Sequence, residues 1–251
     1  ARQYRELHAA HDEGRAAVKT MISLDMSTIA KYVKQELVLI IPLALILPFA
    51  IGNANVIPAA FTPMIPMVLS FTLFALDEQK GWESFRLALP LSRRGVVFGR
   101  YGMGALMTLA GLVFGALVAT ASTAIACLIP ALPNAGSIAA NIEPVESACI
   151  LLASTACAIL ILAATQPLIF KAGMTNGMRF MPLLLVLVMV VAGVALESSG
   201  AWIDVVAPVI DSIFSLPTTS LLTMLGLVVA AFAIYCASAL IACRLYEKRE
   251  L

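Results

Sequence analysis

The chain has 251 residues, of which 61% are hydrophobic and 12% are charged, and its mean hydropathy is +0.96. Soluble domains carry charge on roughly a quarter of their residues, so this composition excludes an ordinary soluble protein and predicts an all-α polytopic membrane protein. The formal net charge of +1 gives no basis for nucleic-acid binding. The positions of the charges along the chain are more informative than their sum.

Residues 1–20 form a polar extension that we expect in the cytosol, ahead of a six-helix transmembrane domain over 21–251. Three origins of the extension stay open: residues left by cloning, an upstream reading of the start, or a short cytosolic helix. Over 22–36, apolar residues recur every three or four positions opposite Lys31 and Lys34. This pattern predicts an amphipathic helix along the inner leaflet, with its lysines facing anionic headgroups. The alternative is that this segment extends the first membrane helix into the cytosol.

Six apolar spans follow, judged against the length of about 20 residues that crosses roughly 30 Å of hydrocarbon. We place them near Leu37–Ile51, Val56–Leu76, Tyr101–Ile129, Ala148–Phe170, Met181–Leu196 and Ser220–Leu245. The second span carries Pro58, Pro63 and Pro66, which predict a kink. The kink serves either as a packing device or as a hinge.

Polar and small residues inside the spans predict where helices meet. Gln166 lies well inside the fourth span, and we expect it to bond to another helix rather than to a substrate. The spacings Gly95-x-x-x-Gly99 and Gly111-x-x-x-Gly115 let helices approach closely in lipid.

The basic residues lie on one side of the membrane if the N-terminus is cytosolic. All 16 Lys and Arg then fall in the N-terminal stretch, the 77–101 stretch, the connection between spans four and five, and the C-terminal end. Membrane proteins concentrate Lys and Arg in cytoplasmic loops. The pattern therefore predicts a multi-pass protein of the cell membrane with both termini in the cytosol. The outer stretch 197–219 mixes acids with Trp202 and Phe214, which predicts short interfacial or re-entrant helices.

The longest charged stretch between two spans runs over 77–101. Within it, the apolar residues Trp82, Phe85 and Leu89 recur at helical spacing. The charged residues Glu83 and Arg86 lie on other faces. This is the pattern of a short amphipathic helix. Pro90 ends that helix, and Ser92 is a suitable N-cap for the next one. A solvated loop would need only the charges, whereas the aromatic residues favour a surface that docks onto a partner.

This stretch resembles the segment between spans two and three in permease subunits of ABC-2 type transporters. The resemblance is strongest to the small six-span permeases that pair with a separate ATPase in peptide export or self-protection. The matching residues are Asp77, Glu78, Trp82, Leu89, Pro90, Leu91, Ser92, Arg93 and Tyr101. In that family the segment is a coupling helix that rests in a groove of the cytoplasmic ATPase.

The resemblance implies an ATPase-coupling interface formed by Asp77, Glu78, Trp82, Glu83, Phe85, Arg86, Leu89, Pro90, Leu91, Ser92 and Arg93. Trp82 and Phe85 would be its apolar anchors, with Glu83 and Arg86 as rim charges. For Arg93, contact with lipid headgroups is an equal alternative.

The resemblance further implies the transmembrane subunit of an ATP-binding cassette exporter, with a pathway formed by two copies or by one copy and a related permease. The sequence has no G-x-x-x-x-G-K-[ST] loop, so we expect ATP and Mg²⁺ in the partner ATPase, and no catalysis or cofactor in this chain. The five cysteines lie in or beside apolar spans without a CxxC pair, and we expect neither a disulfide framework nor a metal site.

Two other functions stay open. A non-transporting membrane scaffold or sensor could recruit a soluble protein through the same charged stretch. A secondary transporter is the third possibility. Such carriers normally keep ionisable residues in the middle of their spans, and the spans predicted here have none there. For an exporter we expect an amphipathic peptide or a lipid-like, antimicrobial compound as substrate, with export and extraction from the membrane both open.

Overall fold

The computed structural model describes residues 2–80, 93–141, 143–174 and 217–247, and within these ranges the chain is helical without strands. The helices are α1 (Arg2–Ile51), α2 (Val56–Lys80), α4 (Arg93–Leu128), α5 (Ala135–Ala140), α6 (Pro144–Ala172) and α9 (Pro217–Glu247). Five of them, all except α5, are long and apolar enough to cross a membrane. The all-α polytopic fold is therefore confirmed for the described ranges. The predicted fifth span and the outer stretch up to 216 lie outside them.

The described helices agree with the predicted spans and extend beyond them. Ile51 ends both the first span and α1, and Val56 begins both the second span and α2. The third span was predicted from Tyr101, but α4 already begins at Arg93. Hydropathy reports only the part of a helix that lies in hydrocarbon, whereas backbone hydrogen bonding continues into the polar ends.

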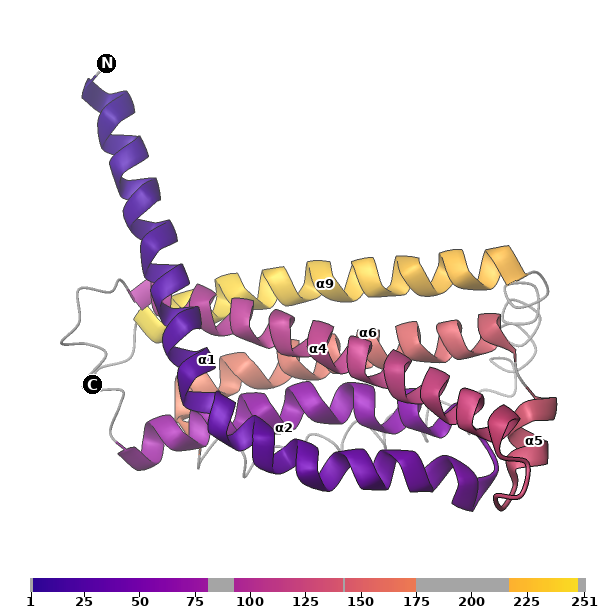
Figure 1. Cartoon of the computed structure of the whole chain (residues 1–251). Coiled ribbons are helices and arrows are strands. Elements are labelled where there is room, and N and C mark those ends of the chain that lie inside the picture. The colour runs from indigo at the N-terminus through magenta and orange to yellow at the C-terminus, as the bar shows by residue number, and fades with distance from the viewer. Residues whose placement is uncertain (1, 81–92, 142, 175–216, 248–251) are drawn as a thin grey trace, which may run out of the picture.

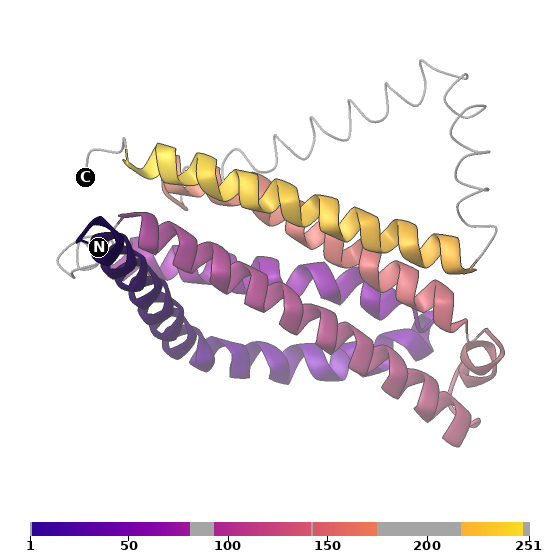
Figure 2. The same ribbon diagram turned by 90° about the horizontal axis from the view of Figure 1, so that it is seen from above.

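The spanning helices form one bundle (Figure 1). The end that holds Arg93 and Arg244 is called the basic end below, and the end that holds Glu143 and Glu146 is called the acidic end. The N-terminus, the last turn of α2, the start of α4 and the last turn of α9 lie at one end. The turn between α1 and α2, the short helix α5 and the start of α6 lie at the other. Figure 2 shows α6 and α9 side by side, and α4 contacts each of the other five described helices. The helix ends thus follow the arrangement that the charge pattern predicts.

The segment predicted as a separate interfacial helix is continuous with the first span in α1. Met21, Asp25 and Ile29 are buried on its inner face, whereas Met26 is 44% exposed. α1 contacts α4 and α2, so this face packs on the bundle. The structure therefore agrees with the alternative, an extension of the first membrane helix, while a position along the inner leaflet stays a prediction.

Glycines of α4 mark its closest approaches to neighbouring helices. A Cβ atom added at Gly111 would lie 2.7 Å from the backbone carbonyl oxygen of Thr62 on α2. That carbonyl lies four residues before Pro66, which has no N–H to donate to it. A Cβ atom at Gly99 would lie 2.6 Å from the Cβ of Met21 on α1. Both predicted glycine motifs thus contain a contact glycine, each against a different helix.

The outward faces of the bundle are apolar. Val38 and Leu39 of α1 are 73% and 77% exposed, and Leu222 of α9 is 72% exposed. In water such surface would be unfavourable, whereas in lipid it contacts hydrocarbon without cost. Helix association in lipid depends on close packing and on buried polar contacts, and the polar contacts between these helices are therefore informative.

Candidate functional site

The predicted coupling interface starts on α2 and ends on α4. Asp77 and Glu78 lie in the last turn of α2, and Arg93 is the first residue of α4. The rest of the interface, from Trp82 to Ser92, lies outside the described residues. Because α2 and α4 pack together, both flanks of the predicted coupling segment are held at the same end of the bundle (Figure 1).

Arg100, two turns into α4, pairs with carboxylates from two other helices. Its Nη2 donates a hydrogen bond to Oδ2 of Asp77 on α2, and its Nη1 lies 3.4 Å from Oδ2 of Asp25 on α1. Its Cζ lies 5.0 Å from the ring centroid of Phe74, also on α2, which is within the range of a cation–π interaction. Three helices thus meet at one guanidinium. Asp25, Asp77 and Arg100 are called the ion cluster below.

The ion cluster is buried although all its members are charged. Asp25 is 1% exposed and Arg100 is 3% exposed, and the side chain of Asp77 is 16% exposed. Charges withdrawn from water are tolerated when they are paired, and removal of one partner typically costs about 3–5 kcal/mol. The planar arginine side chain presents N–H groups in several directions and can serve two carboxylates at once. The cluster therefore fixes α1, α2 and α4 relative to one another beside the coupling segment.

Arg100 belongs to the charged stretch 77–101, whereas no role was predicted for Asp25. The signal that could have identified Asp25 is its position on the same helical face as Met21 and Ile29, both buried. A carboxylate on an inward face must find a partner. Asp77 was predicted to contact an ATPase, and that contact stays a prediction, whereas its pairing with Arg100 is a contact within the chain.

Next to Arg100, Tyr101 begins a layer of buried hydrogen bonds that reaches α6 and α9. The hydroxyl groups of Tyr101 and Ser238 lie 2.9 Å apart. Ser238 Oγ donates to the carbonyl oxygen of Ala163 at 2.6 Å, which leaves Tyr101 as the donor to Ser238. This chain of bonds joins α4 to α9 and α9 to α6.

Tyr235 of α9 completes the layer. Its hydroxyl proton is shared between two acceptors, the carbonyl oxygen of Tyr101 at 2.8 Å and Oε1 of Gln166 at 3.3 Å. Gln166 is 1% exposed. The predicted interhelical bond of Gln166 is thereby confirmed. A Cβ atom at Gly104 would lie 2.5 Å from the Tyr235 hydroxyl oxygen, so this position has room only for glycine while the bonds are made. Tyr101, Gln166, Tyr235 and Ser238 are called the polar layer below.

An apolar cavity of about 200 Å³ lies beyond the polar layer, between α4 and the pair of α6 and α9. Its walls are Ala105, Thr108, Leu109, Leu112, Thr155, Ile159, Leu162, Val228, Phe232 and Tyr235. The threonine hydroxyls donate to carbonyl oxygens of their own helices, Thr108 to Gly104 and Thr155 to Leu151. The cavity therefore presents an apolar surface at the middle of the spans.

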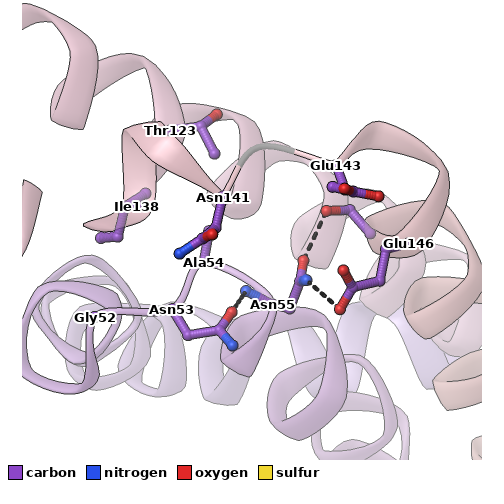
Figure 3. Close-up of a pocket in the computed structure, with 10 residues that line it drawn as sticks. Gly52, Asn53, Ala54, Asn55, Thr123, Ile138, Asn141, Glu143 and Glu146 are labelled. Carbon is purple, nitrogen blue, oxygen red and sulfur yellow. Dashed lines mark hydrogen bonds between the residues drawn. The ribbon is translucent and has the colours of Figure 1, made fainter. Parts of the chain in front are cut away.

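A polar pocket of about 270 Å³ is lined by residues of the turn between α1 and α2 and of the start of α6 (Figure 3). These segments lie at the opposite end of the bundle from the ion cluster (Figure 1). Ser147 Oγ on α6 donates to Oδ1 of Asn55 at 2.6 Å, and Asn55 Nδ2 donates to Oε1 of Glu146 at 3.3 Å. Glu143 lines the same pocket. These bonds tie the start of α2 to the first turn of α6.

The family model described as ABC-2 family transporter protein matches residues 20–247. The chain belongs to the ABC-2 family of transporter proteins. Searches of curated proteins and of solved structures gave no match. The family predicted from the 77–101 stretch is thereby confirmed, and the match covers the described spanning helices except for the part of α1 that precedes residue 20.

Membership makes this chain a multi-pass membrane protein and a permease subunit of an ABC transporter. The ABC-2 family consists of membrane subunits, which are generally not catalytic themselves, and it implies association with an ABC ATPase. The ion cluster, the polar layer and the two cavities are therefore features of an ABC-2 permease.

Proposed function

We propose that this ABC-2 permease is the membrane subunit of an exporter that a separate cytoplasmic ATPase drives through residues 81–92. Two copies, or one copy and a related permease, form the translocation pathway. ATP and Mg²⁺ bind in the ATPase, and closure of the ATPase subunits pushes on the coupling segment. Such rigid-body movements are a common way to pass a conformational change between subunits.

The observation that carries this proposal is the largely buried pairing of Asp77 with Arg100. Asp77 lies four residues before the undescribed segment and Arg100 lies eight residues after it. A force on the segment therefore reaches two paired spanning helices together. A mobile loop between independent helices would instead absorb the force in backbone rotations.

The orientation of the chain in this proposal follows from its charges. The ion cluster, Arg93 and the basic end of α9 lie at the end of the bundle that also holds the N-terminus (Figure 1). The opposite end contains Glu143 and Glu146. By the positive-inside rule, the first end faces the cytosol in this proposal. An ATPase in the cytosol can then reach residues 81–92.

An amphipathic peptide or a lipid-like molecule is the substrate class that we propose. The apolar cavity between α4, α6 and α9 offers hydrocarbon-like walls, and the outer pocket offers the carboxylates of Glu143 and Glu146. A molecule with one apolar and one basic face would be compatible with both environments. A sugar or a bare metal ion would not be compatible with the apolar cavity.

The coupling role is tested by co-purification in detergent with a candidate ATPase, sought first among the genes beside this one, with ATP hydrolysis as the second readout. The variant is Trp82→Ala/Phe85→Ala, and the matched control is Trp202→Ala/Phe214→Ala, which removes the same residue types from the predicted outer stretch. We expect loss of association in the first variant and retention in the second, with both permeases monodisperse. If the native permease binds no ATPase, the exporter function is overturned and a membrane scaffold is favoured.

Substrate class is tested with inverted membrane vesicles that contain permease and ATPase. The probe is a fluorescent synthetic helix of leucine and lysine, compared with the same composition in scrambled order, which has no apolar face. We expect ATP-dependent accumulation of the amphipathic probe alone. Equal accumulation of both probes, or of neither while ATP is hydrolysed, would contradict the proposed substrate class.

A further inference from the structure

We propose that Asp25 and Arg100 are positioning residues that make the N-terminal helix α1 move together with α2 and α4 when the ATPase acts. This inference rests on the proposed function, because it needs an ATP-driven movement. It goes beyond that function by naming which helices form the moving unit and which buried contact holds the unit together.

At the basic end, α1 and α4 are closely packed and are joined by an ion pair. Asp25 pairs with Arg100, and both are almost fully buried. On either side of Arg100, a Cβ atom at Gly99 would lie 2.6 Å from Met21, and one at Gly102 would lie 3.1 Å from Ile22. Tight packing on both sides of a buried ion pair resists sliding and rotation of the two helices.

The same unit includes α2 through the other carboxylate and through a shared core. Asp77 and Phe74 both contact the Arg100 guanidinium. An apolar core joins the three helices along their length, with Ile40 from α1, Leu69 from α2 and Met107 from α4 among its buried members. A push on residues 81–92 therefore acts on α1 through Arg100, although α1 is not adjacent to that segment in sequence.

The contact between α4 and the pair of α6 and α9 is packed differently. Near the basic end the polar layer holds these helices with hydrogen bonds, but beyond it lies the apolar cavity of about 200 Å³. The cavity is open to the outside of the bundle, since Leu109 and Phe232 in its wall are about half exposed. The helices therefore lose direct contact there, which leaves room for rearrangement. The geometry points to movement at this contact, with α1, α2 and α4 on one side and α6 and α9 on the other.

Distances between spin labels test the inference without a known substrate. In a variant without native cysteines, exposed positions Lys31 on α1, Phe98 on α4 and Leu240 on α9 are labelled in pairs. The labelled permease is diluted with unlabelled permease and purified with its ATPase, so that distances arise within one chain. Each pair is measured without nucleotide and after trapping with ATP and vanadate.

In the native background, we expect both distances to α9 to shift together, on the order of a few Å, while the Lys31 to Phe98 distance stays fixed. In Asp25→Asn, the Lys31 to Leu240 distance should no longer shift, whereas the Phe98 to Leu240 distance should still shift. Asp25→Glu should restore the shift of the Lys31 to Leu240 distance. A shift between Lys31 and Phe98 in native chain, or an unchanged pattern in Asp25→Asn, would overturn the inference and leave the exporter intact.

Two further outcomes separate this inference from the proposed function. If no pair shifts in native chain although the ATPase is bound and hydrolyses ATP, both the driven movement and the inference fall. If Asp25→Asn does not fold, the native triplet of distances still decides whether α1 and α4 move as one. A merely structural role for Asp25 would change the yield of folded complex and leave the trapped distances of the folded fraction as in the native chain.

Discussion

The hydroxyl of Tyr235 on α9 donates a hydrogen bond at 2.8 Å to the backbone carbonyl oxygen of Tyr101 on α4. In a helix that carbonyl oxygen is normally used by the N–H four residues later, so Tyr235 adds a second donor to it. Carbonyl oxygens have two acceptor positions, and the bond therefore joins two spanning helices without breaking either. The rings of the two tyrosines also pack, with centroids 4.8 Å apart.

Tyr235→Phe should lower stability by about 1 kcal/mol, the size of an interhelical hydrogen bond in a membrane protein. The substitution removes the bonds to Tyr101 and Gln166 but keeps the ring. Thermal unfolding in detergent, followed by the monodisperse fraction in size exclusion, measures the effect. Ile234→Val, at a 53% exposed position of the same helix, is the control that should leave the midpoint nearly unchanged. An equal effect of both changes would show that the hydroxyl contributes nothing.

Gly111→Ala should destabilise the permease by about 1–3 kcal/mol, the usual cost of overpacking. The added Cβ would lie 2.7 Å from the Thr62 carbonyl oxygen, and a backbone atom cannot move aside as a flexible side chain could. Gly226→Ala is the matched control, because a Cβ there meets nothing within 4 Å. The thermal midpoint of Gly111→Ala should lie below the native value, and that of Gly226→Ala should lie at or above it. A midpoint of Gly111→Ala at or above that of Gly226→Ala would refute the close approach of α4 to α2.

Arg100→Met should lower stability by about 3–5 kcal/mol, because it leaves two carboxylates near each other without their guanidinium. Arg100→Lys should lie between this variant and the native chain, since an ammonium lacks the planar fork. The yield of monodisperse permease and its thermal midpoint measure both effects. Lys34→Met, which removes a positive charge from an exposed position of α1, should be close to native. Native-like stability of Arg100→Met would contradict a buried ion cluster.

Asn55→Ala and Ser147→Ala should each loosen the outer ends of α2 and α6 by about 0.5–1.5 kcal/mol. The double variant should cost no more than Asn55→Ala alone, which also loses the bond to Glu146. Both substitutions remove the same 2.6 Å hydrogen bond. Hydrogen exchange in the first turns of α6 is the local measurement. Asn141→Ala removes a bond within one turn, to Ser137 at 3.0 Å, and should leave exchange in α6 unchanged. Additive effects of the two first variants would show that their side chains act independently.

The sequence by itself determined the described spanning helices and the end of the bundle at which each one starts. A helix in lipid must satisfy its backbone hydrogen bonds within its own segment, so the presence of each described span could be predicted locally. Ile51 and Val56 were placed correctly for that reason. The distribution of Lys and Arg then gave alternate helix directions, and the 77–101 stretch gave the family. The coupling residues from Trp82 to Ser92 stay predictions.

Only the tertiary structure decided which faces of these helices meet. Asp25 and Arg100 are 75 residues apart, yet they pair in the bundle, and Gln166 finds Tyr235 from another helix. Periodicity gives the inward face of a helix but not its rotation, depth or neighbour. These depend on how small residues such as Gly99 and Gly111 let backbones approach. Because such contacts join residues that are distant in sequence and are worth little singly, local sequence patterns cannot specify them, and the assembled bundle does.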